Sequence, residues 1–249
     1  MPSAEAYAPQ VEKEHLWLPR LASELPLSIP VPLTIGEPAD GYPFNWSIYR
    51  WLDGDTATPE RIANLCDFAT SLAQFLIALQ RIDPAGGPAP GSHNFFRGEP
   101  LAAYDTETRQ ANLALRGKID ARAVTDVWEA ALATEWRQPP AWIHGDVSLG
   151  NLVVQQGRLS SVIDFGQLAV GDPACDLALA WTLFEGDSRE AFRSTLALAL
   201  DAGTWARGRG WTLWKALIVA AGLTETNAIE TANCWRTIDE VISDHKREA

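Results

Sequence analysis

The sequence predicts an α+β protein in which a small strand-containing front segment precedes a mostly helical body. Two short runs rich in β-branched and aromatic residues, 29–38 and 45–52, lie near the start and are separated by the Gly and Pro residues of a turn. Most of the remaining chain carries apolar residues at helical spacing. One stretch, 144–166, interrupts that spacing with a hairpin-like pair of runs around Gly157.

The bulk composition excludes some classes of protein and leaves others open. The chain has 249 residues, enough for one large domain or two small ones, and its 47% apolar content predicts a sizeable core. The formal net charge of −12 argues against nucleic-acid binding, because a phosphate backbone needs a basic face. The same charge leaves room for a cationic small substrate, or serves only to keep the protein in solution.

Cysteine usage and hydropathy indicate a cytoplasmic protein. Cys66, Cys175 and Cys234 lie far apart and form no CxxC pair, so neither a disulfide framework nor a zinc site is predicted. The segment 1–14 lacks the basic start and apolar core of a signal peptide. The longest apolar run, 213–223, is too short to span a bilayer, so no membrane partner is expected.

The first helix is expected at 4–21, with Pro9 in its first turn and Pro19 kinking or ending it. Its apolar stripe consists of Tyr7, Val11, Leu18 and Leu21. Glu14 lies on the same stripe. Because a carboxylate is costly to bury alone, Glu14 needs a cationic partner, or else the stripe lies partly in water.

The rest of the chain is predicted to be helical apart from the hairpin. Thr58 is expected to cap a strong helix with Pro59 in its first turn. The apolar stripe of that helix is Ile62, Leu65, Phe68, Leu72, Phe75, Leu76 and Leu79. The segment 83–100 is a loop by composition. Further helices are expected at 104–116, 121–136, 176–184, 188–200, 211–222 and 227–245, and the hairpin strands at 152–155 and 159–164.

Three polar residues flank the hairpin at informative spacings. Asp146 and Asn151 bound a tight loop, and the hairpin returns the chain from Asn151 to Asp164, so all three can converge. Asn and Asp oxygens suit Mg²⁺, a hard cation that binds phosphate oxygens. A further carboxylate can accept the proton of an attacking hydroxyl, which completes the requirements of phosphoryl transfer. A metal-dependent phosphoesterase needs more His and Asp ligands, and of four histidines only His144 lies nearby.

The motifs carry a family resemblance. "HGDVSLGN" at 144–151 followed by "IDFG" at 163–166 resembles the catalytic and metal-binding loops of the kinase-like aminoglycoside phosphotransferase family. The stretch "GDPACDLALAW" at 171–181 is also similar to that family. Upstream, 11–54 is similar to its αC helix, fourth and fifth strands and hinge. The resemblance spans about residues 3 to 240 and implies a protein-kinase-like fold.

The resemblance implies roles for the loop residues. Asp146 is the catalytic base, and Asn151 and Asp164 hold Mg²⁺. Among supporting residues, His144 locks the loop, Gly166 lets the chain turn away after the metal ligand, and Asp176 braces the loop as a hydrogen-bond acceptor.

The same resemblance places a nucleotide site at the front. The backbone of Arg50 and Leu52 is expected to hydrogen-bond the purine edge, with Trp51 between them. Because backbone groups read the base there, the side chains do not distinguish ATP from GTP. Glu14 matches the αC glutamate, which explains a carboxylate on an apolar stripe.

The elements with which the family binds phosphate, a Gly-rich turn between two strands and a third strand with a Lys or Arg, are not found in the sequence. The first glycine is Gly36, and the basic residues before it are Lys13 and Arg20, on or beside the first helix. The expected layout is therefore a truncated N-lobe with its hinge at 1–53, an αC-like helix plus two strands, and a helical C-lobe at 54–249. We expect weakened nucleotide affinity, and association or aggregation through the incomplete sheet.

Together these features predict an ATP- or GTP-dependent phosphotransferase acting on a hydroxyl of an antibiotic-like or metabolite molecule. The alternative is a truncated or pseudokinase-like, non-catalytic remnant of the same family. The segment 83–103 and the C-terminal helices are expected to form the acceptor pocket. The last helix carries three carboxylates that either bind the ammonium groups of an aminosugar or form a solvated helix face: Asp239, Glu240 and Asp244. The eleven tryptophans either include a platform for a sugar or macrolide ring or belong to the core.

Overall fold

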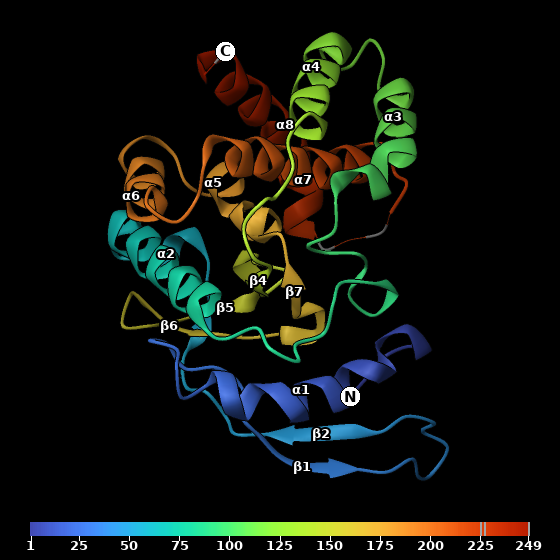
Figure 1. The fold of residues 1–249 in the computed structure, drawn as a ribbon, viewed down its shortest axis with the longest axis vertical. Coiled ribbons are helices and arrows are strands. Elements are labelled where there is room, and N and C mark those ends of the chain that lie inside the picture. Colours follow the sequence, from blue (N-terminus) through green and yellow to red (C-terminus); the bar gives the residue numbers. More distant parts are fainter. Residues whose placement is uncertain (225, 227, 249) are drawn as a thin grey trace.

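The computed structural model describes residues 1–224, 226 and 228–248. It is an α+β structure in which a helix and a two-stranded ribbon lie below a mostly helical body, with a hairpin layer between them (Figure 1). The expected start of the last helix at Asn227 falls outside the described residues. Among those that are described, no helix is both long and apolar enough to cross a membrane.

The front segment consists of α1 (Ala8–Leu21), β1 (Pro32–Gly36) and β2 (Trp46–Tyr49), and the two strands pair antiparallel. Pro9 lies in the first turn of α1, as expected. The helix nevertheless continues past Pro19 to Leu21, because a proline so near the end removes a single backbone hydrogen bond. Tyr7 does not belong to the buried stripe, since it precedes α1 in a 3₁₀ turn and is exposed.

The middle layer contains two small sheets. One has the order β3–β5–β6, formed by β3 (Asp55–Thr56), β5 (Leu152–Gln155) and β6 (Arg158–Val162). The other pairs β4 (Ala141–Ile143) with β7 (Ala169–Gly171). The hairpin turns at Gln156 and Gly157, both with positive φ, which is the turn that closes a two-residue hairpin. The sequence predicted the hairpin but missed β3, β4 and β7, which are too short for an alternating pattern.

The body is helical, and α7 lies at its centre against α3, α4 and α8. Its helices are α2 (Leu65–Arg81), α3 (Asp105–Ala114), α4 (Ala121–Leu132), α5 (Leu179–Thr182), α6 (Gly186–Leu196), α7 (Ala202–Ala220) and α8 (Ala228–Glu248). Their apolar faces join one continuous buried cluster with the hairpin. That cluster fixes the loops that carry the site.

Two helix starts differ most from the sequence-based expectation. Thr58 and Pro59 begin a short 3₁₀ turn, whereas α2 begins after Asn64, whose side chain accepts hydrogen bonds from the N–H groups of Cys66 and Asp67. The helix α7 begins nine residues earlier than the predicted 211 because Asp201 caps it. Gly208 and Gly210 lie inside α7, where an added Cβ would meet neighbouring side chains at 3.0 and 2.7 Å.

Candidate active site

The loop after β4 is held by a buried carboxylate. Asp176 accepts hydrogen bonds from the N–H groups of His144 and Gly145, each at 2.8 Å. The His144 ring is fully buried, with Nε2 3.0 Å from the carbonyl oxygen of Ile163 and Nδ1 3.2 Å from the N–H nitrogen of Asp146. Gly145 has φ +85°, and a Cβ there would lie 2.6 Å from the carbonyl oxygen of Gln167. These contacts fix the direction in which the chain leaves towards Asp146.

Asp146 and Asn151 are bound to each other. The Nδ2 of Asn151 donates to the Asp146 carboxylate at 3.1 Å and to the Asp146 carbonyl at 2.9 Å. The carbonyl of Asn151 accepts the N–H of Ile163 at 2.9 Å. Because Ile163 precedes Asp164, the two ends of the hairpin bring Asp164 beside the Asp146 loop.

Asp164 carries the unusual backbone of this site. It has φ +63°, and its carboxylate accepts the N–H of Gly166 at 3.4 Å. Gly166 lies in the 3₁₀ turn Phe165–Gln167 that follows, while the left-handed residue at the start of this turn is Asp164. Gly166 lies against α1, where a Cβ would be 2.5 Å from the side-chain oxygen of Gln10. Asp and Asn are among the few non-glycine residues that adopt this conformation readily.

A cavity of about 870 Å³ lies between the front segment and this loop. The predicted site residues that line it are Glu14, Arg50, Trp51, Leu52, Asp146 and Asp164. Its volume falls in the range of ligand-binding pockets. Asn151, His144, Gly166 and Asp176 are not among its lining residues. A magnesium ion suits the donor set of Asn151 and Asp164, which offers amide and carboxylate oxygens.

The carboxylate of Glu14 accepts a hydrogen bond from a hydroxyl group and does not form an ion pair among the described residues. The Tyr49 hydroxyl donates to its carboxylate. Burial raises the pKa of Glu14 above its usual value, and the Tyr49 hydrogen bond opposes that shift. Lys13 faces another way, because its Nζ donates to the carbonyls of Gly166 and Leu168 at 2.7 and 3.0 Å. Tyr49 was missed at the sequence level, since its contact with Glu14 spans two elements.

In the segment 50–52, which was expected to bind the purine, one backbone N–H group is already used in a hydrogen bond within the protein. The N–H of Arg50 donates to the carbonyl of Val31 at 2.9 Å, so it is used within the front segment. Trp51 is 83% exposed and does not pack into the core. The N–H of Leu52 has no backbone partner within the described chain. Of the two backbone N–H groups, the one of Leu52 therefore remains open to a ligand, and the N–H of Arg50 does not.

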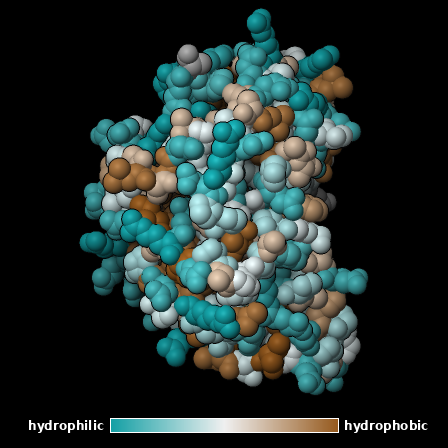
Figure 2. Space-filling view, viewed as in Figure 1, coloured by the Kyte–Doolittle hydropathy of each residue, from teal (hydrophilic) through white to brown (hydrophobic). Residues whose placement is uncertain are grey.

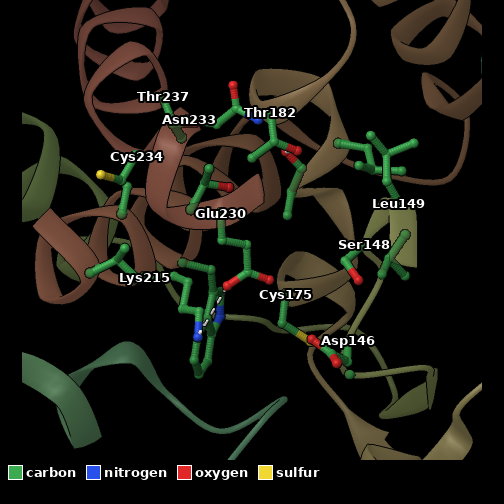
Figure 3. A pocket seen from close by; sticks show the side chains of 18 of the residues that line it. Asp146, Ser148, Leu149, Cys175, Thr182, Lys215, Glu230, Asn233, Cys234 and Thr237 are labelled. Atoms are coloured by element: carbon green, nitrogen blue, oxygen red, sulfur yellow. Dashed lines mark hydrogen bonds and ion pairs between the residues drawn. The ribbon is translucent and has the colours of Figure 1, made fainter. Parts of the chain in front are cut away.

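A second, smaller cavity of about 140 Å³ opens on the other side of Asp146. Figure 3 shows Asp146 on one side of it and Cys234 of α8 on the other. Its polar lining includes Arg97, Lys215 and Glu230. Arg97 lies in the segment expected to contribute to the acceptor pocket. Lys215 could not be recognised from the sequence as a site residue, because it lies among apolar residues of α7.

Three other carboxylates of α8, those of Asp239, Glu240 and Asp244, are not among the lining residues of this cavity. Asp244 is buried and accepts the Nε1–H of Trp181 at 2.8 Å and a guanidinium N–H of Arg209 at 3.1 Å. Glu240 pairs with Arg189 at 2.6 Å, and Asp239 is exposed. The expectation that these residues form either an ammonium site or one solvated face is wrong for Asp244 and Glu240, because arginines of α6 and α7 neutralise them. Buried charges need such partners.

Replacement of Asp176 by Asn is expected to destabilise the loop. Burial raises the pKa of Asp176, and the two N–H donors favour its charged form. An asparagine can accept only through one oxygen, so one buried N–H faces an amide NH₂. We expect the free energy of unfolding to fall by about 2 kcal/mol in denaturant titrations. Unchanged unfolding midpoints for the variant and for the wild type would contradict this account.

Lys13 is expected to make stability depend on pH above neutrality. Burial lowers its pKa from 10.5 to about 8 in the folded chain. The unfolded state therefore binds more protons between these values, and stability rises as pH increases from about 8 to 10.5. Relative to Lys13→Met, the wild type should gain about 2 kcal/mol over that range in denaturant unfolding. Parallel pH profiles for the two proteins would refute the prediction.

Comparison with known proteins identifies relatives of the whole arrangement. Residues 1–211 match the family model APH, described as the phosphotransferase enzyme family. An aminoglycoside 3'-phosphotransferase of Escherichia coli is 33% identical over 93 residues, which cover 31% of this chain and 34% of that protein. The matched part thus spans about a third of the length of this curated relative.

Solved structures resemble the fold over nearly the full chain. The GDP and kanamycin complex of APH(2″)-IIIa superposes with a TM-score of 0.67 at 18% identity, covering 98% of this chain and 85% of that one. Macrolide 2'-phosphotransferase type I gives a TM-score of 0.60 at 19% identity, covering 94% and 80%. At such identities the likeness concerns the fold, and it supports the kinase-like α+β architecture.

Proposed function

The chain belongs to the phosphotransferase enzyme family, and from that membership we propose that it transfers the γ-phosphate of ATP or GTP to a hydroxyl of a small molecule. One observation carries the proposal. Among the described residues, Asp146 alone lines both the larger cavity beside Asp164 and the smaller cavity among the C-terminal helices. A carboxylate at that junction can reach an acceptor hydroxyl from one side and a nucleotide phosphate from the other.

The proposed reaction uses three groups of this chain. Asp146 accepts the proton of the acceptor hydroxyl, whose oxygen bonds to the γ-phosphorus as the bond to the β,γ-bridging oxygen breaks. ADP or GDP leaves. Asn151 and Asp164 would hold Mg²⁺, which supplies positive charge against the phosphate oxygens when bound. The backbone around Leu52 would contact the purine.

The supporting residues keep this geometry fixed. Asp176 and His144 orient the loop before Asp146, and the hydrogen bond from Asn151 sets the direction of the Asp146 carboxylate. Catalysis of phosphoryl transfer consists mainly of such positioning together with charge stabilisation. In the described lining of the larger cavity, Arg50 is the one basic side chain, so we expect nucleotide binding to depend strongly on the metal.

Transfer of γ-labelled phosphate tests the proposal. Purified protein with Mg²⁺ and labelled ATP or GTP should phosphorylate hydroxyl compounds from a mixed panel, and EDTA should abolish the transfer. Failure to move label to any acceptor with either nucleotide would favour the second candidate, a non-catalytic member of the family. No feature of the two cavities favours that candidate over phosphotransfer.

We also propose that the front ribbon promotes self-association. Leu33, Ile35 and Ile48 are exposed on β1 and β2, and β1 has no second partner strand among the described residues. Figure 2 shows hydrophobic side chains at the lower end of the molecule, where this ribbon lies in Figure 1. Exposed strand edges with apolar side chains pair readily with other chains.

Lysine substitutions are expected to reduce that association. Ile35→Lys with Ile48→Lys should shift the protein towards monomer in size-exclusion chromatography with light scattering at high concentration. Leu198→Lys, at a fully exposed leucine of the helical body, is the matched control and should leave the elution unchanged. A wild type that remains monomeric at high concentration would contradict the proposal.

A further inference from the structure

We infer that the acceptor cavity selects a compact hydroxyl compound carrying a carboxylate or another anionic oxygen group, held by Arg97 beside Trp211, and that it disfavours polycationic aminosugars. The inference rests on the proposed function, in that the smaller cavity is taken as the acceptor site beside Asp146. It adds the charge and size of the acceptor, which neither the family nor the fold specifies.

The cavity offers little negative charge to a polycation. The acidic residues that line it are Asp146 and Glu230. Glu230 lies 3.6 Å from Nζ of Lys215, and Figure 3 shows the two side chains pointing toward one another. Asp146 is therefore the one lining carboxylate without a cationic partner in the described part of the chain. Several ammonium groups entering together would lose hydration without matching carboxylates.

Arg97 presents an unneutralised cation to the same cavity. Its guanidinium lies over the rings of Trp211 and Trp214, at 5.2 and 4.7 Å from their centroids, and its Nε donates to Oε1 of Gln167 at 3.2 Å. No carboxylate of the described residues forms an ion pair with it. Stacking and the Gln167 hydrogen bond hold the planar group in place and leave other N–H donors for a ligand. A fixed guanidinium of this kind matches the two oxygens of a carboxylate.

Trp211 adds a buried donor on the same wall. Its side chain lines the cavity and is 3% exposed, and its Nε1–H has no hydrogen-bond partner among the residues that the structure describes. Buried donors normally have partners, and an orphaned one is an unfavourable feature that a ligand oxygen can relieve. Trp211 and Lys215 are four residues apart on α7, so both project to one face of the helix. The cavity lining thus offers the N–H of Trp211 and the guanidinium of Arg97, while Lys215 is paired with Glu230.

The remaining lining sets the size and polarity of the acceptor. Leu149, Leu179, Ala216 and Val219 are among the apolar side chains that line it. The cavity volume of about 140 Å³ is close to that of an engineered cavity, about 150 Å³, that holds one benzene molecule. A compact apolar unit with one hydroxyl and one anionic group fits this lining better than a chain of amino sugars.

Calorimetric titration with charge-matched probes tests the inference without nucleotide or turnover. The probes are 3-(hydroxymethyl)benzoate, the neutral 3-(hydroxymethyl)benzamide and the cationic 3-(aminomethyl)benzyl alcohol, with kanamycin as a polycation. The wild type should bind the benzoate at least about tenfold more tightly than the cationic probe, which is the scale of one charge-assisted hydrogen bond. Because phosphate transfer is not measured, failure here leaves the proposed function standing.

Variants test whether Arg97 and Trp211 cause the preference for the benzoate probe. Arg97→Met should reduce the benzoate preference to within about threefold, whereas Arg158→Met, at an exposed arginine of β6, should retain it in full. Trp211→Phe removes the N–H together with part of the aromatic ring, so the two probes are compared within the variant: benzoate binding should weaken by about threefold more than binding of the cationic probe. Equal or tighter binding of the cationic probe or kanamycin by the wild type would overturn the inference. So would an Arg97→Met variant that keeps the preference, or the absence of binding by every probe.

Discussion

Asp146→Asn is expected to lower kcat for phosphate transfer by about 10²- to 10⁴-fold, the usual contribution of a general base. The substitution keeps the size and shape of the side chain and its position beside Asn151, but an amide does not accept the acceptor's proton. Because Asp146 borders both cavities, no other described residue is placed to replace it. Initial-rate assays with labelled nucleotide measure the effect.

The control for this change is a surface aspartate of α8. Asp239→Asn alters the net charge by the same amount at an exposed position outside both cavities and should leave kcat unchanged. Binding of the nucleotide should survive in Asp146→Asn, since the metal ligands remain. A variant at Asp146 that transfers phosphate at the wild-type rate would remove the proposed base.

Asp164→Asn is expected to lower kcat/KM by about 10³-fold through loss of the metal. Removing this carboxylate leaves Asn151 as the other proposed ligand, and several kcal/mol of charge stabilisation go with the ion. Asparagine is the informative replacement because it tolerates the left-handed backbone at this position, with φ +63°. The fold should therefore survive, and circular dichroism with thermal unfolding checks that it does.

Metal titration separates this effect from simple disruption of the loop. Raising the Mg²⁺ concentration should partly restore activity in Asp164→Asn, whereas Asp126→Asn, on the exposed face of α4, should show the wild-type metal dependence. An Asp164→Asn protein with an unchanged Mg²⁺ requirement would show that the carboxylate does not hold the ion.

Local features of the site could be predicted from the sequence. The turn at Gly157 and the apolar runs on either side define the hairpin, because both depend on a few neighbouring residues. Because the two strands of a hairpin end side by side, the sequence also predicts that Asp164 lies near the loop that carries Asp146. The resemblance drawn from these motifs is confirmed by the family match over residues 1–211.

Features that depend on distant partners could not be predicted. The contact between Glu14 and Tyr49 joins α1 to β2, and the arginine partners of Asp244 come from α6 and α7. Helix α7 contains Gly208 and Gly210, which favour loops by propensity, yet close approach of Leu177 and Leu101 requires glycine there. Tertiary packing overrode the local preference at these positions.

In the proposed mechanism, the Asp146 carboxylate removes a proton, while Asn151 and Asp164 hold the metal that binds the nucleotide. These two roles are separated by calorimetric titration of Mg·ATP and Mg·GTP into the wild type, Asp146→Asn and Asp164→Asn, with transfer rates measured on the same samples. We expect Asp146→Asn to bind nucleotide like the wild type without transferring phosphate, and Asp164→Asn to lose Mg²⁺-dependent binding. Loss of nucleotide binding in Asp146→Asn, together with retained binding in Asp164→Asn, would contradict the assignment.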